Sequence, residues 1–170
     1  MDAPGHSSIA VRPSGPLSGE VQLSGAKNSV LKLLAATTLA EGTFVLRNVP
    51  QIADVEWMSD LLVAMGAVVR RPQPGVVMVD SPSDLVPEAP YELVERMRAS
   101  IVVLGPLLAR FGQARVSLPG GDNFGPRPID LHLRALEQLG AKLELVHGFV
   151  EAVAPNGLRG ARILLDFPSV

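Results

Sequence analysis

The sequence has no cysteine and few aromatic residues. The absence of cysteine excludes a disulfide framework and any metal site built from thiolates, and it is compatible with a reducing compartment. Phenylalanine, tryptophan and tyrosine together make up 4% of the 170 residues. A hydrophobic core therefore has to be built from valine, leucine, isoleucine and alanine.

Long apolar runs and an excess of one charge are missing too. The longest apolar run, 101–109, contains a glycine and a proline and is far shorter than the ~20 residues that span a bilayer. The formal net charge is −2, and no basic patch with interleaved aromatic residues indicates a nucleic-acid or anionic-membrane partner. The N-terminus has no basic region followed by an apolar stretch, so we expect no signal peptide and a cytoplasmic protein.

Several common site motifs are also absent. The sequence has no phosphate-binding P-loop, no serine nucleophile elbow and no dinucleotide-binding fingerprint. The three histidines, His6, His132 and His147, do not have the spacing of metal ligands. We therefore expect neither a metal nor a cofactor.

What the chain does contain is an internal repeat. With 47% hydrophobic and 19% charged residues it has the composition of a globular protein, and Gly66 and Gly140 follow two matched helices at the place of a left-handed C-cap. The first copy is expected to have a leading strand at 20–23, helices at 28–40 and 54–65, and strands at 43–48, 68–70 and 76–80. The second copy is expected to have helices at 91–111 and 129–139, and strands at 113–118, 142–146 and 149–154, with a hairpin turn at His147-Gly148.

The repeat predicts a domain organisation. We expect one α/β (α+β) unit at 20–170, with copies at about 20–82 and 83–158 and the start of a third at 159–170. Repeat arrays usually need about three copies to bury their shared core, so we interpret the unit as incomplete. An open repeat would leave an apolar face exposed, and self-association is then expected. The alternative is that two copies and their flanking strands form a complete small domain.

The first candidate site motif is Ser24-Gly25-Ala26-Lys27-Asn28. Gly25 allows a tight turn, and an apolar helix follows that Asn28 or Ser29 can cap. The start of a helix presents unpaired N–H groups and a partial positive charge, which suit a phosphate or carboxylate, and Lys27 adds a full charge there. The alternative is a solvated lysine beside an ordinary helix cap.

The second candidate is Arg98. Arg96 and Arg98 would point in different directions on a helix, and the apolar residues after Arg98 predict that it is at least half buried. A half-buried arginine needs an anionic partner. That partner is either a ligand or a structural carboxylate, for which Glu92 and Glu95 are the candidates.

The third candidate is the loop 119–128, which is rich in glycine and proline. Asp122 lies at its tip and Arg127 at its exit. Long loops of such composition are often functional, although a plain surface connection is the alternative. Together, Lys27, Arg98 and Arg127 would suit a small, highly anionic substrate such as a phosphorylated carboxylate.

These motifs resemble the UDP-N-acetylglucosamine 1-carboxyvinyltransferase (MurA) family of enolpyruvyl transferases. The resemblance runs in order over nearly the whole chain and corresponds to about the first two-fifths of the family's length. The related enzyme of the shikimate pathway has a similar repeat but favours Gly-Ser-Lys-Ser in its first motif. The segments that carry the resemblance are 24–31, 97–100, 104–107, 118–122, 127–132 and 136–141.

The resemblance implies a fold and a reaction. The fold is the inverse α/β-prism of two domains, each with three βαβαββ units, in which residues 1–19 belong to the other domain. The reaction moves the enolpyruvyl group of phosphoenolpyruvate to the 3-hydroxyl of UDP-N-acetylglucosamine and releases phosphate, in the first committed step of peptidoglycan synthesis. These two compounds are the implied partners, with no nucleic acid and no membrane.

The resemblance also implies roles for individual residues. Lys27, Asn28 and Arg127 would bind phosphoenolpyruvate, and Arg98 would contact the substrates. The residues implied for the nucleotide-sugar pocket are Arg98, Arg127, Pro128, Ile129, Asp130, Leu131, Phe167, Pro168, Ser169 and Val170.

Asp122 takes the place of the cysteine that most of the family uses as the general acid. An aspartate can protonate the substrate only when it is itself protonated. Arg127 nearby opposes that state and a bound trianion favours it, so we expect a competent acid only in the substrate complex. A carboxylate should also resist the epoxide antibiotic fosfomycin, which alkylates the thiol.

The resemblance implies that a second domain completes the catalytic cleft. On that basis we expect this chain alone to be inactive or very weak. Two alternatives remain open: a non-catalytic split homologue that binds nucleotide sugar or a partner chain, and an enolpyruvyl transferase for another acceptor.

Overall fold

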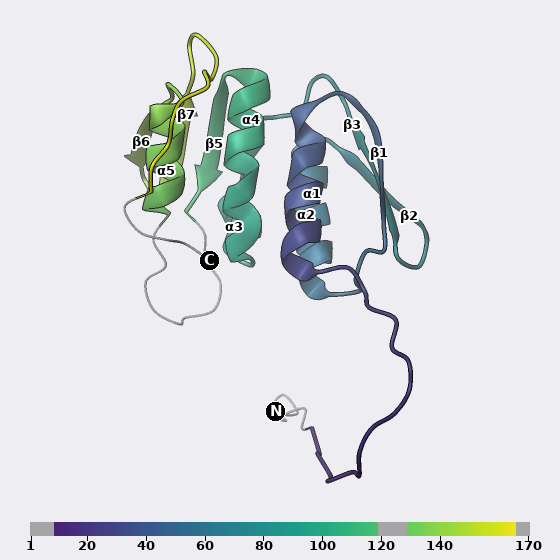
Figure 1. Cartoon of the computed structure of the whole chain (residues 1–170). Helices are drawn as coiled ribbons and strands as arrows, with labels where there is room; N and C mark the ends of the chain where they lie inside the picture. The colour runs from purple at the N-terminus through teal and green to yellow at the C-terminus, as the bar shows by residue number, and fades with distance from the viewer. Residues whose placement is uncertain (1–8, 119–128, 166–170) are drawn as a thin grey trace, which may run out of the picture.

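Helices pack between two small sheets in the computed structural model, which describes residues 9–118 and 129–165 (Figure 1). The first half of the chain forms α1 (Lys27–Ala36), the 3-10 helix η1 (Thr37–Leu39), β1 (Gly42–Arg47), α2 (Ala53–Ala64), β2 (Val68–Gln73) and β3 (Val76–Ser81). The second half forms β4 (Glu88–Ala89), α3 (Tyr91–Val94), the 3-10 helix η2 (Arg98–Val103), α4 (Leu104–Phe111), β5 (Gln113–Ser117), α5 (Asp130–Gln138), β6 (Lys142–Val146) and β7 (Phe149–Val153).

The two sheets have the same connectivity. The strand order is β1-β3-β2 in the first and β4-β5-β7-β6 in the second, so β5, β7 and β6 repeat the order of the first sheet. All of these neighbours are antiparallel except β4, which adds to β5 in parallel. At the turn between β6 and β7, His147 and Gly148 both have positive φ, which a two-residue hairpin turn requires, so the predicted turn is confirmed.

Most of the expected helices and strands are present, with ends displaced by at most three residues. The helix at 28–40 begins one residue earlier and tightens into η1 at its end. Gly66 and Gly140 have φ of +104° and +99°, as expected for glycines that end helices. None of the helices that the structure describes is both long and apolar enough to cross a membrane.

The single helix expected at 91–111 is wrong, because the segment forms three shorter pieces. Met97 is buried and adopts an extended backbone (φ −147°, ψ 118°), which ends the first piece. Pro106 cannot donate the backbone hydrogen bond that a continuous helix would need, and in α4 it falls within the first turn, where no donor is required. The chain therefore runs through η2 and restarts as α4.

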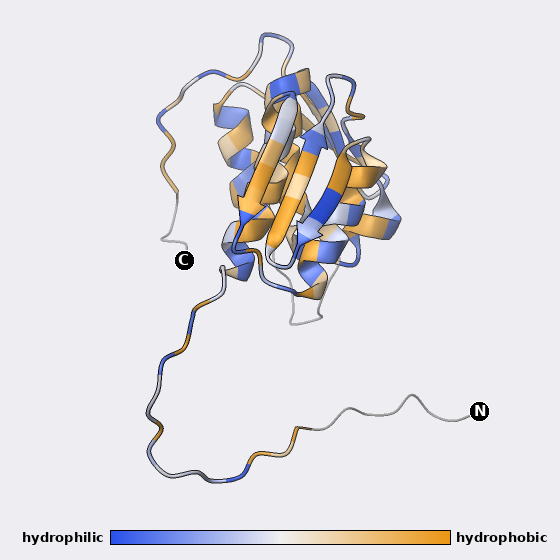
Figure 2. Ribbon diagram, turned by 90° about the vertical axis from the view of Figure 1, so that its right-hand side faces the viewer, coloured by the Kyte–Doolittle hydropathy of each residue, from blue (hydrophilic) through white to orange (hydrophobic). Residues whose placement is uncertain are grey.

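The leading strand expected at 20–23 is also wrong. These residues are extended but join no sheet, and Val21 and Leu23 are largely exposed. In Figure 2, which looks onto the first sheet, this N-terminal segment runs away from the body of the molecule. The described part of the expected third copy, residues 159–165, forms neither helix nor strand.

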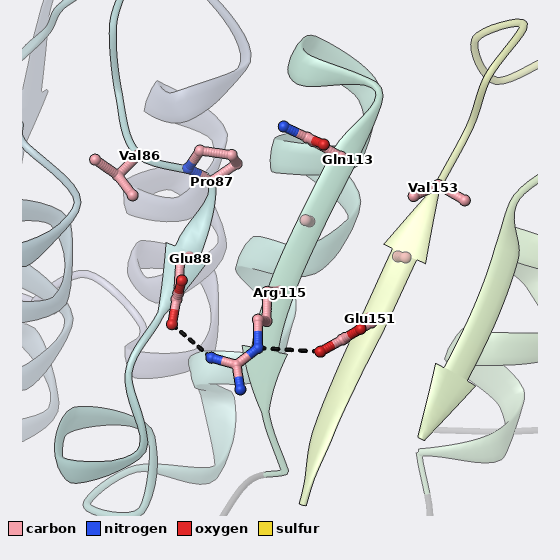
Figure 3. A pocket seen from close by; sticks show the side chains of 9 residues that line it. Val86, Pro87, Glu88, Gln113, Arg115, Glu151 and Val153 are labelled. Carbon is pink, nitrogen blue, oxygen red and sulfur yellow. Dashed lines mark hydrogen bonds and ion pairs between the residues drawn. The ribbon is translucent and has the colours of Figure 1, made fainter. Parts of the chain in front are cut away.

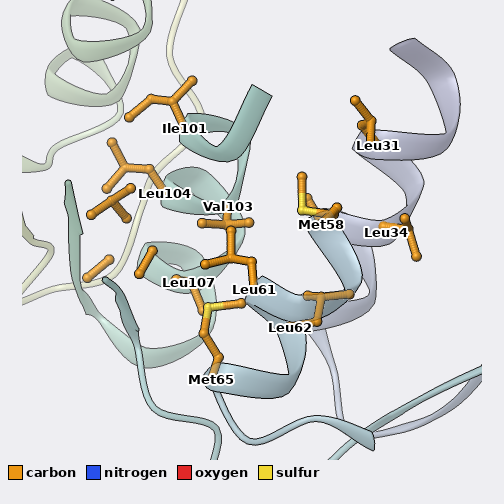
Figure 4. Packing of buried hydrophobic residues seen from close by; sticks show 14 of the residues in the cluster. Leu31, Leu34, Met58, Leu61, Leu62, Met65, Ile101, Val103, Leu104 and Leu107 are labelled. Carbon is orange, nitrogen blue, oxygen red and sulfur yellow. The ribbon is translucent and has the colours of Figure 1, made fainter. Parts of the chain in front are cut away.

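One buried cluster joins the two halves of the chain. Figure 4 shows members of the cluster from α1, α2, η2 and α4 packed side by side. Aliphatic residues and methionine dominate the cluster, as the shortage of aromatic residues predicts. The largest fully buried side chains are Leu31, Leu34, Met58, Leu61, Leu62, Met65, Leu104, Leu107 and Leu108, with Val55, Val79 and Val94.

Arg110 fastens α4 to the first half of the chain. One guanidinium nitrogen donates to the carbonyl oxygen of Thr38 (3.1 Å) and to Oγ of Ser81 (2.9 Å), and another donates to the carbonyl oxygen of Pro82 (2.7 Å). The guanidinium also lies 4.9 Å from the centre of the Phe111 ring. The guanidinium group thus satisfies hydrogen-bond acceptors in η1 and at the end of β3, beside the shared core.

Candidate functional site

The start of α1 is held against the end of β1. The backbone N–H of Gly25 donates to the carbonyl oxygen of Asn48 at 3.1 Å, and a Cβ at Gly25 would lie 2.2 Å from that oxygen. Only glycine allows this approach. Asn48 itself has φ of +56°, a conformation that asparagine tolerates better than most residues.

No side chain caps the start of α1. The N-cap residue is Ala26, and both Asn28 and Ser29 lie exposed within the first turn, so the expectation that one of them caps the helix is wrong. The first N–H groups of this 10-residue helix are therefore not satisfied by a capping side chain. Such groups favour an anion, and Lys27 is the first residue of the helix.

Lys27 is paired with a residue that the sequence motifs do not include. Its Nζ lies 2.8 Å from Oδ1 of Asp54, in the first turn of α2. The side chain of Asp54 is 19% exposed and that of Lys27 is 55% exposed. A carboxylate at a helix start is a common stabilising feature, so the sequence alone offered no reason to connect Asp54 with Lys27.

A cavity of about 330 Å³ opens beside the start of α1. Its lining is mostly apolar and comes from one flank of the helix and the last residues of β1, including Ser29, Leu33 and Val45. Lys27 and Asp54 do not line it. The cavity thus adds space next to the helix start, and Arg47 is the charged residue of its lining.

Arg98 is half-buried, as expected, and is the first residue of η2. Because η2 packs against α1, the structure brings the Arg98 segment and the start of α1 onto neighbouring elements. The buried Ser100 hydroxyl donates to the carbonyl oxygen of Met97 and fixes the turn that follows Arg98. Arg96 and Arg98 do not share a helix.

Glu95, one of the two candidate partners of Arg98, binds another residue. Its carboxylate accepts a hydrogen bond from Tyr91, and that bond raises the pKa of the Tyr91 hydroxyl above its usual value. The charge of Glu95, burial and the charge of Glu92 add smaller effects in the same direction. The stability that this contact contributes is present below the usual pKa of ~10 and is lost as pH rises through the raised value.

We expect Glu95→Gln to lower the pKa of Tyr91, because both the hydrogen bond and the repulsive charge weaken. Tyr91 is the only tyrosine of the sequence, so tyrosinate absorbance during an alkaline titration reports it alone. Glu92→Gln is the matched control and should lower the midpoint less. Equal midpoints in Glu95→Gln and the unchanged protein would contradict the contact.

The described residues at the start of α5 form no ion pair with Lys27 or Asp54, which pair with each other. Ile129, Asp130 and Leu131 are all half-buried, with Ile129 as N-cap and Asp130 in the first turn. Leu131 lines a small cavity of about 40 Å³ between α5 and residues 163–165. In Figure 1 the starts of α1 and α5 and the end of β5 lie at the same end of the molecule.

Seven of the predicted site residues lie outside the described residues. Their positions in the site therefore remain predictions. They are Asp122, Arg127, Pro128, Phe167, Pro168, Ser169 and Val170.

A second charged cluster lies on β4, β5 and β7 (Figure 3). Arg115 donates to Glu88 (2.6 Å) and Glu151 (3.2 Å), and its guanidinium lies 3.6 Å from the centre of the Phe149 ring. Burial lowers the pKa of Arg115, but the hydrogen bonds and charges of both carboxylates outweigh it and raise the pKa overall. Two carboxylates already neutralise this cation, so the adjoining cavity of about 390 Å³ is a poor anion site, and we interpret the cluster as a clamp on the two-residue strand β4.

Nothing in the described ranges offers a metal site. Among residues 9–118 and 129–165, no three histidine, aspartate or glutamate side chains cluster so that they could hold an ion. At the start of α1, Lys27 and the uncapped backbone N–H groups are suited to bind an anion.

Curated relatives match almost the whole chain. It is 54% identical over 165 residues to UDP-N-acetylglucosamine 1-carboxyvinyltransferase of Anaeromyxobacter sp. (strain Fw109-5), an alignment that covers 95% of this chain and 39% of that protein. It is 51% identical over 163 residues to the protein of the same name from Sorangium cellulosum (strain So ce56), with 96% and 38% covered. The chain thus spans about two-fifths of the length of these relatives.

Solved structures show the same fold. The enolpyruvyl transferase NikO from Streptomyces tendae matches with a TM-score of 0.69 and 28% identity over 84% of this chain and 31% of that chain. EPSP synthase from Acinetobacter baumannii matches with a TM-score of 0.65 and 19% identity over 89% of this chain and 35% of that chain, which supports the fold alone. The predicted enolpyruvyl transferase fold is confirmed.

A family comparison covers most of the sequence. The profile of EPSP synthase (3-phosphoshikimate 1-carboxyvinyltransferase) matches residues 11–170. This range includes every predicted site residue. By this match the chain belongs to the EPSP synthase family of enolpyruvyl transferases.

Proposed function

We propose that this chain carries part of the substrate site of a UDP-N-acetylglucosamine 1-carboxyvinyltransferase. The reaction transfers the enolpyruvyl group of phosphoenolpyruvate to the 3-hydroxyl of the sugar nucleotide and releases phosphate, for peptidoglycan synthesis in the cytoplasm. The observation that carries the proposal is Lys27 at the uncapped start of α1, in a chain about half identical to proteins of that name. The start of α1 is suited to the phosphate or carboxylate of phosphoenolpyruvate.

The other residues take their proposed roles from the same reaction. Asn28 joins Lys27 at phosphoenolpyruvate, and Arg98 contacts the substrates from η2. In the loop, Arg127 contributes positive charge and Asp122 acts as the general acid, in a form that resists fosfomycin. Ile129, Asp130 and Leu131, with Pro128, Phe167, Pro168, Ser169 and Val170, complete the nucleotide-sugar pocket.

The proposed domain organisation has support in the N-terminal segment. Ile9, Val11 and Leu17 are almost fully exposed in an extended segment. Apolar residues at alternate positions are typical of a strand with one buried face. We infer that residues 1–19 pack on a second domain, while residues 20–170 form the unit of copies 20–82, 83–158 and 159–170.

We expect Lys27→Ala to weaken phosphoenolpyruvate binding by about 10- to 100-fold, the value of a charge-assisted hydrogen bond. Calorimetric titration of the chain with phosphoenolpyruvate, at saturating UDP-N-acetylglucosamine, measures the change. Lys32→Ala is the matched control, because Lys32 is exposed on the same helix. Equal affinities for the two variants would contradict the proposed site.

A phosphate-release assay then separates binding from turnover. Binding of both compounds without phosphate release would favour a nucleotide-sugar binding protein, and release with a different acceptor would favour an enolpyruvyl transferase of other specificity. Release with UDP-N-acetylglucosamine would support the proposed reaction and would contradict the expectation that this chain alone is inactive.

A further inference from the structure

Lys27 has two possible anionic partners: the substrate proposed above and the carboxylate of Asp54. We propose that Asp54 is a positioning residue that competes with the anionic substrate for Lys27 and so sets how strongly the site holds anions. The inference rests on the proposed function of Lys27. Its structural basis is the 2.8 Å contact between Lys27 Nζ and Asp54 Oδ1.

Asp54 is the fixed member of the pair. It lies in the first turn of α2, next to the buried Val55, and its side chain is much less exposed than that of Lys27. The N-terminus of α2 carries a partial positive charge, which attracts the carboxylate of Asp54. Lys27, by contrast, has a long and largely exposed side chain that can reach another anion without movement of the backbone.

The two helix starts make the competition direct. Because α1 and α2 pack against each other, the carboxylate of Asp54 reaches the ammonium group at the uncapped start of α1. A phosphate bound there would have to share Lys27 with Asp54 or displace it, and it would feel the repulsion of a carboxylate nearby. Removing the charge of Asp54 should therefore strengthen the binding of a simple anion.

The pair matters little to the fold. Lys27 is more than half exposed, and exposed ion pairs contribute little to stability. Asp54→Asn keeps the size and shape of the side chain, and it removes no capping hydrogen bond, because the N-cap of α2 is Ile52 and no side chain caps this helix. The variant should fold, so changes in binding can be assigned to the charge.

Glu56 provides a matched control. It lies in the same first turn of α2 and carries the same charge, but its carboxylate pairs with Arg71 at 2.7 Å. Glu56→Gln therefore removes one negative charge from the same helix turn without touching Lys27. A general effect of surface charge would appear in both variants.

The test is a titration of the whole chain with inorganic phosphate. Binding is measured by calorimetry and by the fluorescence of Trp57, the only tryptophan of the sequence, which lies in α2. We expect Asp54→Asn to tighten phosphate binding by about fivefold at low salt, because the phosphate no longer competes with the attraction between Lys27 and Asp54, that of two unit charges a few ångströms apart in high dielectric. Glu56→Gln should change it by less than about twofold, because screening weakens charges that are farther off. In a Lys27→Met background, the gain from Asp54→Asn should mostly disappear.

Each contrary outcome has a distinct meaning. Unchanged or weaker binding by Asp54→Asn, while Lys27→Met loses affinity, overturns the competition and leaves the proposed function intact. An equal gain in the Lys27→Met background overturns it as well, since Asp54 would then act without Lys27. If Lys27→Met binds phosphate and phosphoenolpyruvate as tightly as the unchanged chain, or if neither protein binds them, the competition and the proposed function both fail.

Discussion

Replacing Gly25 with alanine is expected to lower the free energy of unfolding by about 3 kcal/mol, the upper end of the cost of overpacking. The added Cβ would lie 2.2 Å from the carbonyl oxygen of Asn48, a backbone atom. Asn48 cannot move away easily, because Val49 is buried and its N–H donates to the carbonyl oxygen of Gly75 at 3.0 Å. The strain would also break the hydrogen bond from Gly25 to Asn48.

The same change should damage the candidate anion site. Gly25 fixes where α1 begins, so a displaced Gly25 displaces the first turn and Lys27 with it. We expect phosphate binding to weaken in Gly25→Ala, unless the substitution prevents folding altogether. Either result would show that the position of Gly25 matters more than that of an ordinary loop glycine.

Urea denaturation measures the stability change, with Gly105→Ala as the matched control. Gly105 lies in α4, its φ is not positive, and a Cβ built there has no atom within 4 Å apart from its chain neighbours and the helix's own backbone. Alanine is the better helix former by about 1 kcal/mol, so this variant should be as stable as the unchanged protein or more so. If both variants unfold at the same urea concentration, the prediction that Gly25 lies too close to Asn48 for a side chain is contradicted.

Local sequence patterns predicted the elements whose causes are local. The hairpin at His147-Gly148 follows from turn chemistry, and the glycines after α2 and α5 follow from helix termination. The break in the helix expected at 91–111 was missed although Pro106 was visible. A proline limits where a helix can run, but the extended conformation of the buried Met97 depends on packing that the sequence does not show.

Among the charged residues, too, those that depend on local sequence were predicted and those that depend on distant partners were missed. Lys27 was predicted from its place before an apolar helix, and Arg98 was predicted to be half-buried from its apolar neighbours. Asp54 and Arg110 were missed because their partners lie far away in sequence: Asp54 meets Lys27, and Arg110 meets Thr38, Ser81 and Pro82. Pairing between distant segments depends on the packed arrangement of the helices, which no local pattern encodes.

Leu61→Ala is expected to lower the free energy of unfolding by about 3 to 4 kcal/mol, the cost of truncating a buried leucine and leaving a cavity. Leu61 has 0% of its surface exposed. Figure 4 shows its side chain, on α2, directed toward Val103 from the second half of the chain. The cavity would open between rigid helices, which can relax only in part.

The shared core makes a stronger prediction than a loss of stability. The chain has one tryptophan, Trp57 in the first half, and one tyrosine, Tyr91 in the second, so each half has its own optical probe. If one core holds both halves, Leu61→Ala must shift the urea midpoints of Trp57 fluorescence and Tyr91 absorbance together. Leu33→Ala is the control, since Leu33 is 57% exposed on α1 and its loss should cost less than about 1 kcal/mol. A shift of the Trp57 transition alone would mean that the two halves unfold separately and that the packing of Leu61 toward η2 contributes little.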